Sequence, residues 1–346
     1  MAISATIVDI RGVSVTPIIE EILFANDTVN KNLVTLATDI KSDTVFTEND
    51  NSVTAQAFAS GAPSSSGTFG LVDTLITPTK IMYYQEFDPN ALRSSRFNRT
   101  MKPGAWEIES SEFGSVVLKS YGNLIAEDLQ SKFWNGATSA TRTAVAALTP
   151  GTAQNQVSSV EQALVASGSA SLLDGVATRM IYNGGALGTR IKVLGTTISS
   201  TNIQTEYAKI YAAIPARVIN GAVKPFIYAP YSHKQFINIY NVSATYRDLF
   251  AVTNLGQPTE AYFYNGIQIQ FVPLAENVVI ACRPDYIFWC TDLVSDINKF
   301  EVNKIAFNRE DMFVKNIMTI FAHVVNQAMN VLYVGYNLME GQPSLL

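Results

Sequence analysis

The sequence predicts an α+β protein built along one long helix. A single amphipathic segment at 106–134 is unusually long, and two strand-like segments precede it. After it, short strand-like segments alternate with shorter helical patterns, and the chain closes with strand-like runs. We therefore expect helices and β-sheet to share one extended body.

The segment from Trp106 to Trp134 has the pattern of an amphipathic helix. Val116, Leu118 and Leu124 widen an apolar stripe that recurs at every fourth position, at Phe113, Val117, Tyr121, Ile125, Leu129 and Phe133. Pro103-Gly104 suits a loop that enters the helix, and Asn135-Gly136 tolerates the left-handed conformation that ends one. At about 1.5 Å per residue the helix would be roughly 40 Å long.

Two strand-like segments and a stretch of small residues before this helix predict a two-stranded excursion. Residues 44–47 and 69–84 are rich in β-branched and aromatic side chains, and 52–59 is also predicted to be extended. The sequence SGAPSSSG at 60–67 cannot pack a core. A two-stranded sheet alone is only marginally stable in water. We therefore expect the excursion to lie on another subunit, with Phe69, Tyr83 and Tyr84 as candidate contacts.

The composition also favours an assembly. Charged residues make up 15% of the chain, where about 25% is typical. Weak charge repulsion lets apolar surface patches meet, which an obligate assembly tolerates because neighbours bury much of that surface.

The charge distribution argues against nucleic-acid binding as the main activity. Residues 1–50 carry eight acidic and three basic side chains, which already gives the net charge of −5. The remainder is balanced and has no dominant basic face. We also expect no secretory signal in MAISATIVDIRG and no membrane span, because no apolar run reaches about 18 residues.

Arg93, Arg96, Arg99 and Lys102 recur at intervals of three. This basic strip is compatible with an intersubunit contact to acidic groups of a neighbour or with packaged nucleic acid. A solvated helix face that only aids solubility is the alternative.

Residues that carry catalysis or bind metals are sparse. His233 and His323 belong to no zinc-like spacing, and His323 is predicted to be a packed residue. Cys282 and Cys290 lie in an apolar stretch, as buried free thiols do. The glycine-rich run at 182–188 lacks the Lys-Ser/Thr of a phosphate loop and is predicted to be a turn. We therefore predict no catalytic, cofactor or metal site.

The remaining elements follow from local patterns. Residues 16–23 have the pattern of a short helix, and 136–159 is predicted to be a linker or surface excursion. A helix capped by Thr201 carries the stripe Ile203, Tyr207, Ile210, Tyr211 and Ile214, and Ser232 is predicted to cap a second. Asn265-Gly266 predicts a hairpin. The other predicted strands are 226–229, 278–281, 286–290, 300–307 and a run at 312–334 whose end is also compatible with helix.

The order of these segments carries a resemblance. GTFGLVDTLITPTKIMYY, EFDPNALRSSRF and LIAEDLQSKFWNGATSAT are followed by KPFIYAPYSHKQFINIY, YNGIQIQFVPLAENVVIACRPDYIFWC and EDMFVKNIMTIFAHVVN. In layout and over nearly its whole length, the chain resembles the major capsid proteins of tailed bacteriophages with the HK97 fold. The resemblance rests on element order and length, not on a short motif.

The resemblance implies a division of the chain. Residues 1–42 would be an N-terminal arm and 43–85 the extended E-loop that overlaps a neighbour. Residues 86–164 would open the peripheral domain, including the spine helix at 106–134. Residues 165–275 would form the axial domain, and 276–346 the return strands of the peripheral domain and the C-terminus.

The resemblance also implies a structural, non-enzymatic function. Such proteins assemble as hexamers and pentamers into an icosahedral or prolate shell around double-stranded DNA, which they contact non-specifically. Expected partners are a portal, a separate scaffolding protein and, in some members, decoration proteins. The expected location is the virion capsid, assembled in the bacterial cytoplasm without a membrane.

Two departures from the family pattern add expectations. In some members, a covalent bond between an E-loop lysine and an asparagine of a neighbour cross-links the shell. Here residues 42–79 contain no lysine, and only Lys41 and Lys80 flank this segment. We therefore predict non-covalent maturation. We also expect no fused scaffolding segment in the short N-terminal region, so a separate scaffolding protein is expected, with a scaffold-independent route as the alternative.

Two other functions remain open at this stage. One is an encapsulin-like nanocompartment shell with the same fold, which would enclose a cargo enzyme instead of DNA. The other is a mixed α/β hydrolase or transferase with an unrecognised site.

Overall fold

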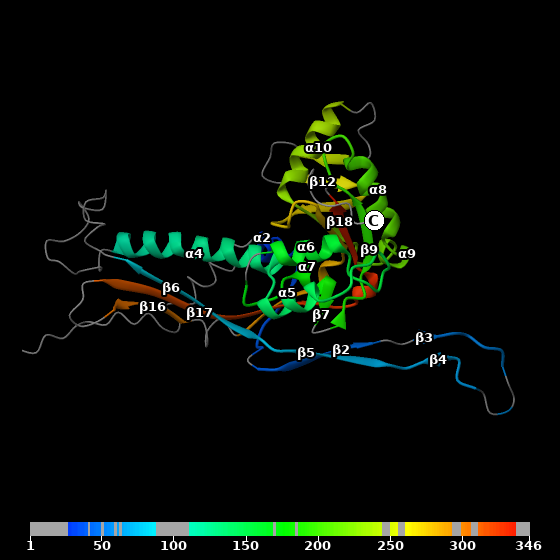
Figure 1. The fold of residues 1–346 in the computed structure, drawn as a ribbon, viewed down its shortest axis with the longest axis horizontal. Helices are drawn as coiled ribbons and strands as arrows, with labels where there is room; N and C mark the ends of the chain where they lie inside the picture. The colour runs from blue at the N-terminus through cyan, green and yellow to red at the C-terminus, as the bar shows by residue number, and fades with distance from the viewer. Residues whose placement is uncertain are drawn as a thin grey trace, which may run out of the picture.

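The computed structural model describes residues 27–40, 42–49, 52–58, 61, 64–87, 111–168, 171–183, 186–243, 250–254, 260–292, 299–305 and 311–336. Figure 1 shows a central body. A long helix and several strands beside it extend from one side of this body, and a narrow ribbon of strands extends from the other. The predicted helix at 16–23 lies outside the described residues.

A seven-stranded mixed sheet forms the centre of the body. Its order is β11-β12-β13-β10-β14-β18-β9, with β10–β13 and β18–β9 parallel. The bounds are β11 Phe250–Thr253, β12 Ala261–Tyr264, β13 Ile267–Phe271, β10 Phe226–Ala229, β14 Val278–Cys282, β18 Val331–Tyr336 and β9 Ile191–Thr196. The sheet therefore combines strands from both sides of the expected 275/276 boundary.

Helices cover both faces of this sheet. Alternate residues of β10 point to opposite faces, with Ile227 in one hydrophobic core and Tyr228 in the other. On the Ile227 side lie α8 (Ile203–Ala213), α10 (Tyr231–Ser243) and the short α9 (Ala216–Ile219). On the Tyr228 side lie α5 (Ser139–Ala146), α6 (Ser159–Ser167) and α7 (Val176–Ile181). Every residue of β14 is consequently buried.

The prediction of a linker at 136–159 is wrong. Helix α5 begins after Thr138, whose hydroxyl accepts a hydrogen bond from the amide of Thr141, and it buries Val145. The segment's small Ala and Thr residues resemble a linker in composition but allow α5 to pack against α6. Ser158 and Glu161 form the capping box that begins α6.

Two predicted helix caps also differ from the structure. The N-cap of α8 is Asn202 instead of Thr201, and its side chain accepts hydrogen bonds from Ser199. Helix α10 already begins at Tyr231, and the Ser232 hydroxyl is buried without a partner in the described part of the chain. The predicted hairpin is confirmed, since Asn265 and Gly266 both have positive φ angles between β12 and β13.

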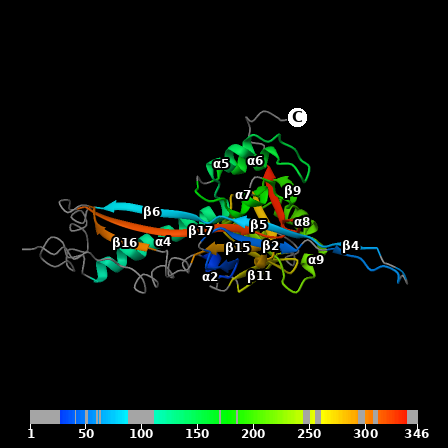
Figure 2. The same ribbon diagram turned by 90° about the horizontal axis from the view of Figure 1, so that it is seen from below.

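A second sheet runs outward from the body and lies beside the long helix (Figures 1 and 2). Strand β17 pairs with β15 and β16 along one edge and with β6 along the other, and β1 pairs with β15. The bounds are β1 Thr35–Ala37, β15 Ile287–Thr291, β17 Met312–Val324, β16 Lys299–Lys304 and β6 Thr79–Phe87. The predicted run at 312–334 is thus two strands, because left-handed Asn326 and a 3₁₀ turn, η4 (Gln327–Met329), separate β17 from β18.

Short elements complete the described chain. The helix α2 (Asp27–Asn30) precedes β1, and the 3₁₀ turn η3 (Pro284–Tyr286) precedes β15. Within the glycine-rich run, β7 (Tyr182–Asn183) pairs antiparallel with β8 (Ala186–Leu187), and the two residues between them lie outside the described chain.

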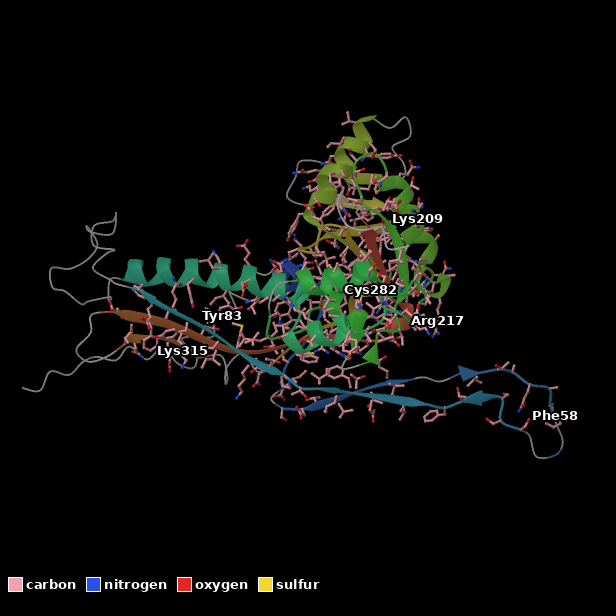
Figure 3. The ribbon with its side chains drawn as sticks, viewed as in Figure 1. Phe58, Tyr83, Lys209, Arg217, Cys282 and Lys315 are labelled. Carbon is pink, nitrogen blue, oxygen red and sulfur yellow. The ribbon has the colours of Figure 1, made fainter. Side chains whose placement is uncertain are left out.

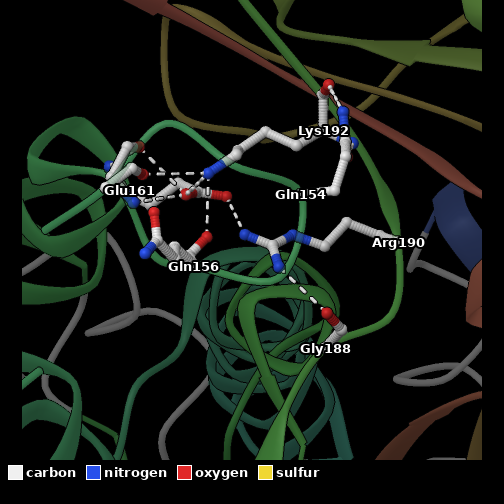
Figure 4. A network of polar contacts seen from close by, with 8 residues as sticks. Gln154, Gln156, Glu161, Gly188, Arg190 and Lys192 are labelled. Carbon is white, nitrogen blue, oxygen red and sulfur yellow. Dashed lines mark hydrogen bonds and ion pairs between the residues drawn. The ribbon is translucent and has the colours of Figure 1, made fainter.

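A buried charged cluster joins α6 to β9, the strand at one edge of the large sheet (Figure 4). The carboxylate of Glu161 accepts from Arg190 Nη2 and from the backbone amide of Ser158, and lies 3.6 Å from Lys192 Nζ. Lys192 Nζ also donates to the carbonyls of Gly151 and Gln156. Burial lowers the pKa of Lys192, and Glu161 opposes that shift. One anion therefore compensates two buried cations.

We predict that Glu161→Gln destabilises the unassembled chain by about 3–5 kcal/mol, because Arg190 and Lys192 would stay buried without a counter-charge. The change keeps the side-chain shape, and urea unfolding measures the loss. Asp285→Asn is the matched control, since the Asp285 side chain is 42% exposed in its pair with Arg283 and should cost less than about 1 kcal/mol. Equal losses in the two variants would contradict the prediction.

Candidate intersubunit surfaces

A two-stranded ribbon extends from the body (Figures 1 and 3), and most of its apolar side chains are exposed. Strand β2 (Thr44–Asn49) pairs with β5 (Leu71–Ile76), and β3 (Ser52–Val53) pairs with β4 (Gly67–Thr68) nearer the tip. Phe58 is 96% exposed and Phe69 82%, and the other exposed apolar residues are Val45, Val53, Leu71, Val72 and Leu75. Exposed apolar groups gathered on one element indicate an interaction surface.

The ribbon matches the predicted excursion in its main features. The strand at 44–47 is confirmed within β2, but the predicted strand at 69–84 is two strands, β5 and β6, interrupted at Thr77-Pro78. Only Ser52 and Val53 of 52–59 are in a strand. Near the tip, Ser66 Oγ donates to the Thr54 carbonyl and Gln56 Nε2 to the Ser64 carbonyl. These hydrogen bonds therefore join the two sides of the ribbon near its tip.

Only the base of the ribbon packs on the described body. Ile76 is fully buried in a small core with Cys290, Phe321 and Ile40. The Phe46 ring lies 5.4 Å from Phe288. The carboxylate of Glu48 accepts a hydrogen bond from the Asn326 amide across the connection after β17. The base is therefore anchored, and the apolar groups further out remain available to another molecule.

The long helix α4 spans Ser111–Asn135 and is about 37 Å long. It ends where Asn135-Gly136 predicts, while the expected first residues 106–110 lie outside the described chain. Ile125, Leu129 and Phe133 are buried and Tyr121 is half-buried, which confirms the stripe there. The side chains of Phe113 and Val117 lie outside the described part. Leu124, predicted to widen the stripe, is instead 61% exposed.

Polar and apolar contacts fix helix α4 to the second sheet, which contains β6, β15 and β17 and which we call the outer sheet. Tyr83 Oη on β6 donates to Asp128 at 2.6 Å, and Lys132 bonds the same carboxylate. Burial, followed by the bond to Asp128, raises the pKa of Tyr83. Phe133 stacks on Trp289 of β15 at 4.3 Å between ring centroids. Helix and sheet thus form one stiff unit.

The candidate contact residues fall into three groups. Phe69 is on the exposed ribbon, and Tyr84 is 46% exposed on the face of β6 away from α4, against Phe313. Tyr83, labelled in Figure 3, points toward α4 and bonds within its own subunit. Arg93, Arg96, Arg99 and Lys102 lie outside the described residues.

The histidines and cysteines are packed in the interior. His233 bonds Tyr207 Oη through Nδ1, and burial lowers its pKa to about 4. Both cysteines are buried free thiols, as predicted. Within the described ranges, no group of His, Cys, Asp and Glu side chains could hold a metal ion. In the same ranges, no helix has the length and apolarity to cross a membrane.

We predict that Ile125→Asp lowers the free energy of unfolding by several kcal/mol, because the carboxylate would be buried without a partner between α4 and the outer sheet. The neighbouring Leu124→Asp is the control, since that position faces solvent and should change stability by less than about 0.5 kcal/mol. Thermal and urea unfolding of both variants measure the difference. A stable Ile125→Asp chain would show that the stripe is not a core face.

By sequence, the chain matches no family model and no curated protein. By structure, it is similar to capsid chains over almost its whole length. The capsid of a native GTA particle matches with a TM-score of 0.55 at 10% identity, covering 91% of each chain. The capsid of Myoviridae phage XM1 matches with a TM-score of 0.52 at 9% identity, over 89% of this chain and 92% of that one.

A third match is the satellite phage P4 procapsid that includes the size determination protein. Its TM-score is 0.50 at 10% identity, over 91% of this chain and 97% of that one. At such low identity the similarity establishes the fold. The chain therefore has the α+β, HK97-like fold of these capsid chains, as the order of its segments indicated.

Proposed function

We propose that the chain is the major capsid subunit of a tailed-phage-like particle and has a structural, non-enzymatic role. The observation that carries the proposal is the ribbon, whose exposed apolar side chains need a partner that the isolated chain does not provide. The capsid-type fold supplies the partner class, since a second copy of the same chain repeats the surface in a closed assembly.

In this proposal, the parts of the chain have separate mechanical roles. The ribbon and β6 correspond to the E-loop at 43–85, which lies on a neighbour. Helix α4 is the spine helix of the peripheral domain at 86–164, and the seven-stranded sheet supports the axial domain at 165–275. Residues 276–346 add return strands to both sheets, and 1–42 supply an N-terminal arm.

The proposed assembly is a shell of hexamers and pentamers that encloses double-stranded DNA. Because the chain has no dominant basic face, its proposed contacts with DNA are weak as well as sequence-independent. Proposed partners are a portal, decoration proteins and a separate scaffolding protein. The P4 procapsid, with its size determination protein, is one shell in which a further protein is present. The proposed location is the virion.

We predict that Phe58→Ser combined with Phe69→Ser reduces particle yield at least tenfold without unfolding the chain. Both side chains are almost fully exposed, so the fold of one subunit loses little when they are removed. Leu172→Ser is the control, because Leu172 is 63% exposed on the body instead of the ribbon. Negative-stain microscopy and native mass measurement report assembly, and circular dichroism reports folding.

Closed particles from the unaltered chain and from Leu172→Ser, but not from the double variant, are the expected result. A small monodisperse species from the unaltered chain under all assembly conditions would reject the shell. Nucleic-acid content of native particles separates a DNA shell from an encapsulin-like compartment, which would contain a cargo protein.

We predict that mature particles dissociate to a single band of about 38 kDa on denaturing gels. The ribbon segment 42–79 contains no lysine that could form a bond to a neighbour's asparagine. Boiled particles and unassembled chain are compared in adjacent lanes. A ladder of higher bands would contradict non-covalent maturation.

A further inference from the structure

The base of the ribbon rests on a small apolar surface that we call the ribbon seat. The seat consists of Phe288 and Cys290 on β15 with Phe321 and His323 on β17. In the register of the two strands, Phe288 lies opposite His323 and Cys290 opposite Phe321, so all four side chains share one face. Phe46 and Ile76 of the ribbon complete the contact.

His323 is the polar member of this apolar contact. It is fully buried, and its ring centroid lies 5.3 Å from that of Phe46. Neither ring nitrogen has a hydrogen-bond partner within the described residues. Burial, with a smaller contribution from Arg179, lowers the pKa of His323 to about 4. The imidazole is therefore neutral while the ribbon is seated at neutral pH.

The charged groups around the seat disfavour a proton on His323. The Arg179 guanidinium on α7 lies 3.9 Å from the centre of the Phe321 ring, on the same face of β17. The one carboxylate that β2 brings to this side, Glu48, already accepts from the Asn326 amide. Asp174, near Arg179, accepts from the Thr138 amide and the Thr141 hydroxyl.

The remaining titratable groups near the seat do not compensate either. Asp292, the buried residue that follows β15, lies four residues along the chain from Phe288, the residue opposite His323. Burial raises the pKa of the Cys290 thiol to about 12, so this group stays neutral. A proton on His323 would place a second cation beside Arg179 among aromatic rings. Detachment of Phe46 would expose the imidazole to water and relieve this cost.

We propose that the ribbon seat is an acid-sensitive latch, in which neutral His323 holds the base of the ribbon and protonated His323 releases it. The latch rests on the proposed function, because it would regulate the angle at which the ribbon reaches a second copy. Release frees β2 and β5 from their contact with β15 and β17, while the whole of β6 stays paired with β17. The break between the two strands at Thr77-Pro78 then becomes the pivot between β5 and β6.

The direction of the pH effect follows from proton binding. A detached imidazole has a pKa near 6.5 and the seated one about 4, so the seated state binds fewer protons in between. Seating has its full strength well above pH 6.5 and weakens as the pH falls through 6.5 toward 4. The difference of 2.5 in pKa corresponds to a limiting, roughly 300-fold rise in the ratio of released to seated ribbon, which is reached only well below pH 4.

Hydrogen–deuterium exchange of the β2 and β5 amides in the unassembled full chain tests the latch between pH 7 and pH 4, after correction for intrinsic exchange. A detached two-stranded ribbon is only marginally stable, so its amides exchange readily once the base is released. We expect protection of these amides to fall by roughly 100-fold in the unaltered chain between pH 7 and pH 4. His323→Phe and His323→Leu should keep their protection across this range, because neither side chain binds a proton. Two replacements of different shape are used so that a packing defect in one variant does not decide the result.

His233→Phe is the matched control. His233 is the other histidine of the chain, is buried with its pKa also lowered to about 4, and lies in α10 against Tyr207, in a different hydrophobic core from the seat. This variant should lose ribbon protection with falling pH as the unaltered chain does.

An unaltered chain whose ribbon protection does not change with pH would overturn the latch. The latch would equally be overturned if both His323 variants lost protection with falling pH as the unaltered chain does. Because exchange is measured before assembly, these outcomes leave the shell proposal standing. Failure of shell formation, in turn, leaves the exchange result intact.

Discussion

Strand β17 is the element on which the rest of the structure depends, because both of its edges and both of its faces are in use. It pairs with β6 on one edge and with β16 and β15 on the other. Met318 and Ile320 point into the core that α4 covers, while Phe321 and His323 point to the base of the ribbon. A change of register by one residue would exchange these two sets of side chains. The positions of the helix and the ribbon are therefore set together by one strand.

Much of the fold could be predicted because local patterns and tertiary packing agree. The stripe at Ile125, Leu129 and Phe133 has helical period, and Asn265-Gly266 suits its turn through positive φ angles. Two of the wrong predictions have the same cause, which is that local sequence does not reveal neighbours. The small residues of 136–159 resemble a linker until α6 lies beside α5. Leu124 was predicted to widen the stripe, but its side chain is 61% exposed, so the buried face of the helix is narrower than the apolar pattern.

The intersubunit surfaces were only partly predictable. The strand-rich composition of 44–47 and the small residues that follow indicated an excursion, and its isolation from a core indicated exposure. Nothing local distinguishes Tyr83 from Tyr84, because strand alternation assigns one to α4 and the other to solvent only after pairing with β17 is known. The ribbon seat was missed for a similar reason. The seat residues and the ribbon residues packed on them come from four segments, and a packed role for His323 was predicted without its contact to Phe46.

The charge of the ribbon has a consequence for the chain before it finds its neighbours. A two-stranded ribbon has two open backbone edges, which in a concentrated solution are templates for pairing with the edges of other ribbons. Between 42 and 79 the sequence carries the acidic residues Asp43, Glu48, Asp50 and Asp73 and no basic one. Two ribbons that approach each other therefore repel. Newly made chains can accumulate with apolar ribbons exposed and still avoid aggregating ribbon to ribbon.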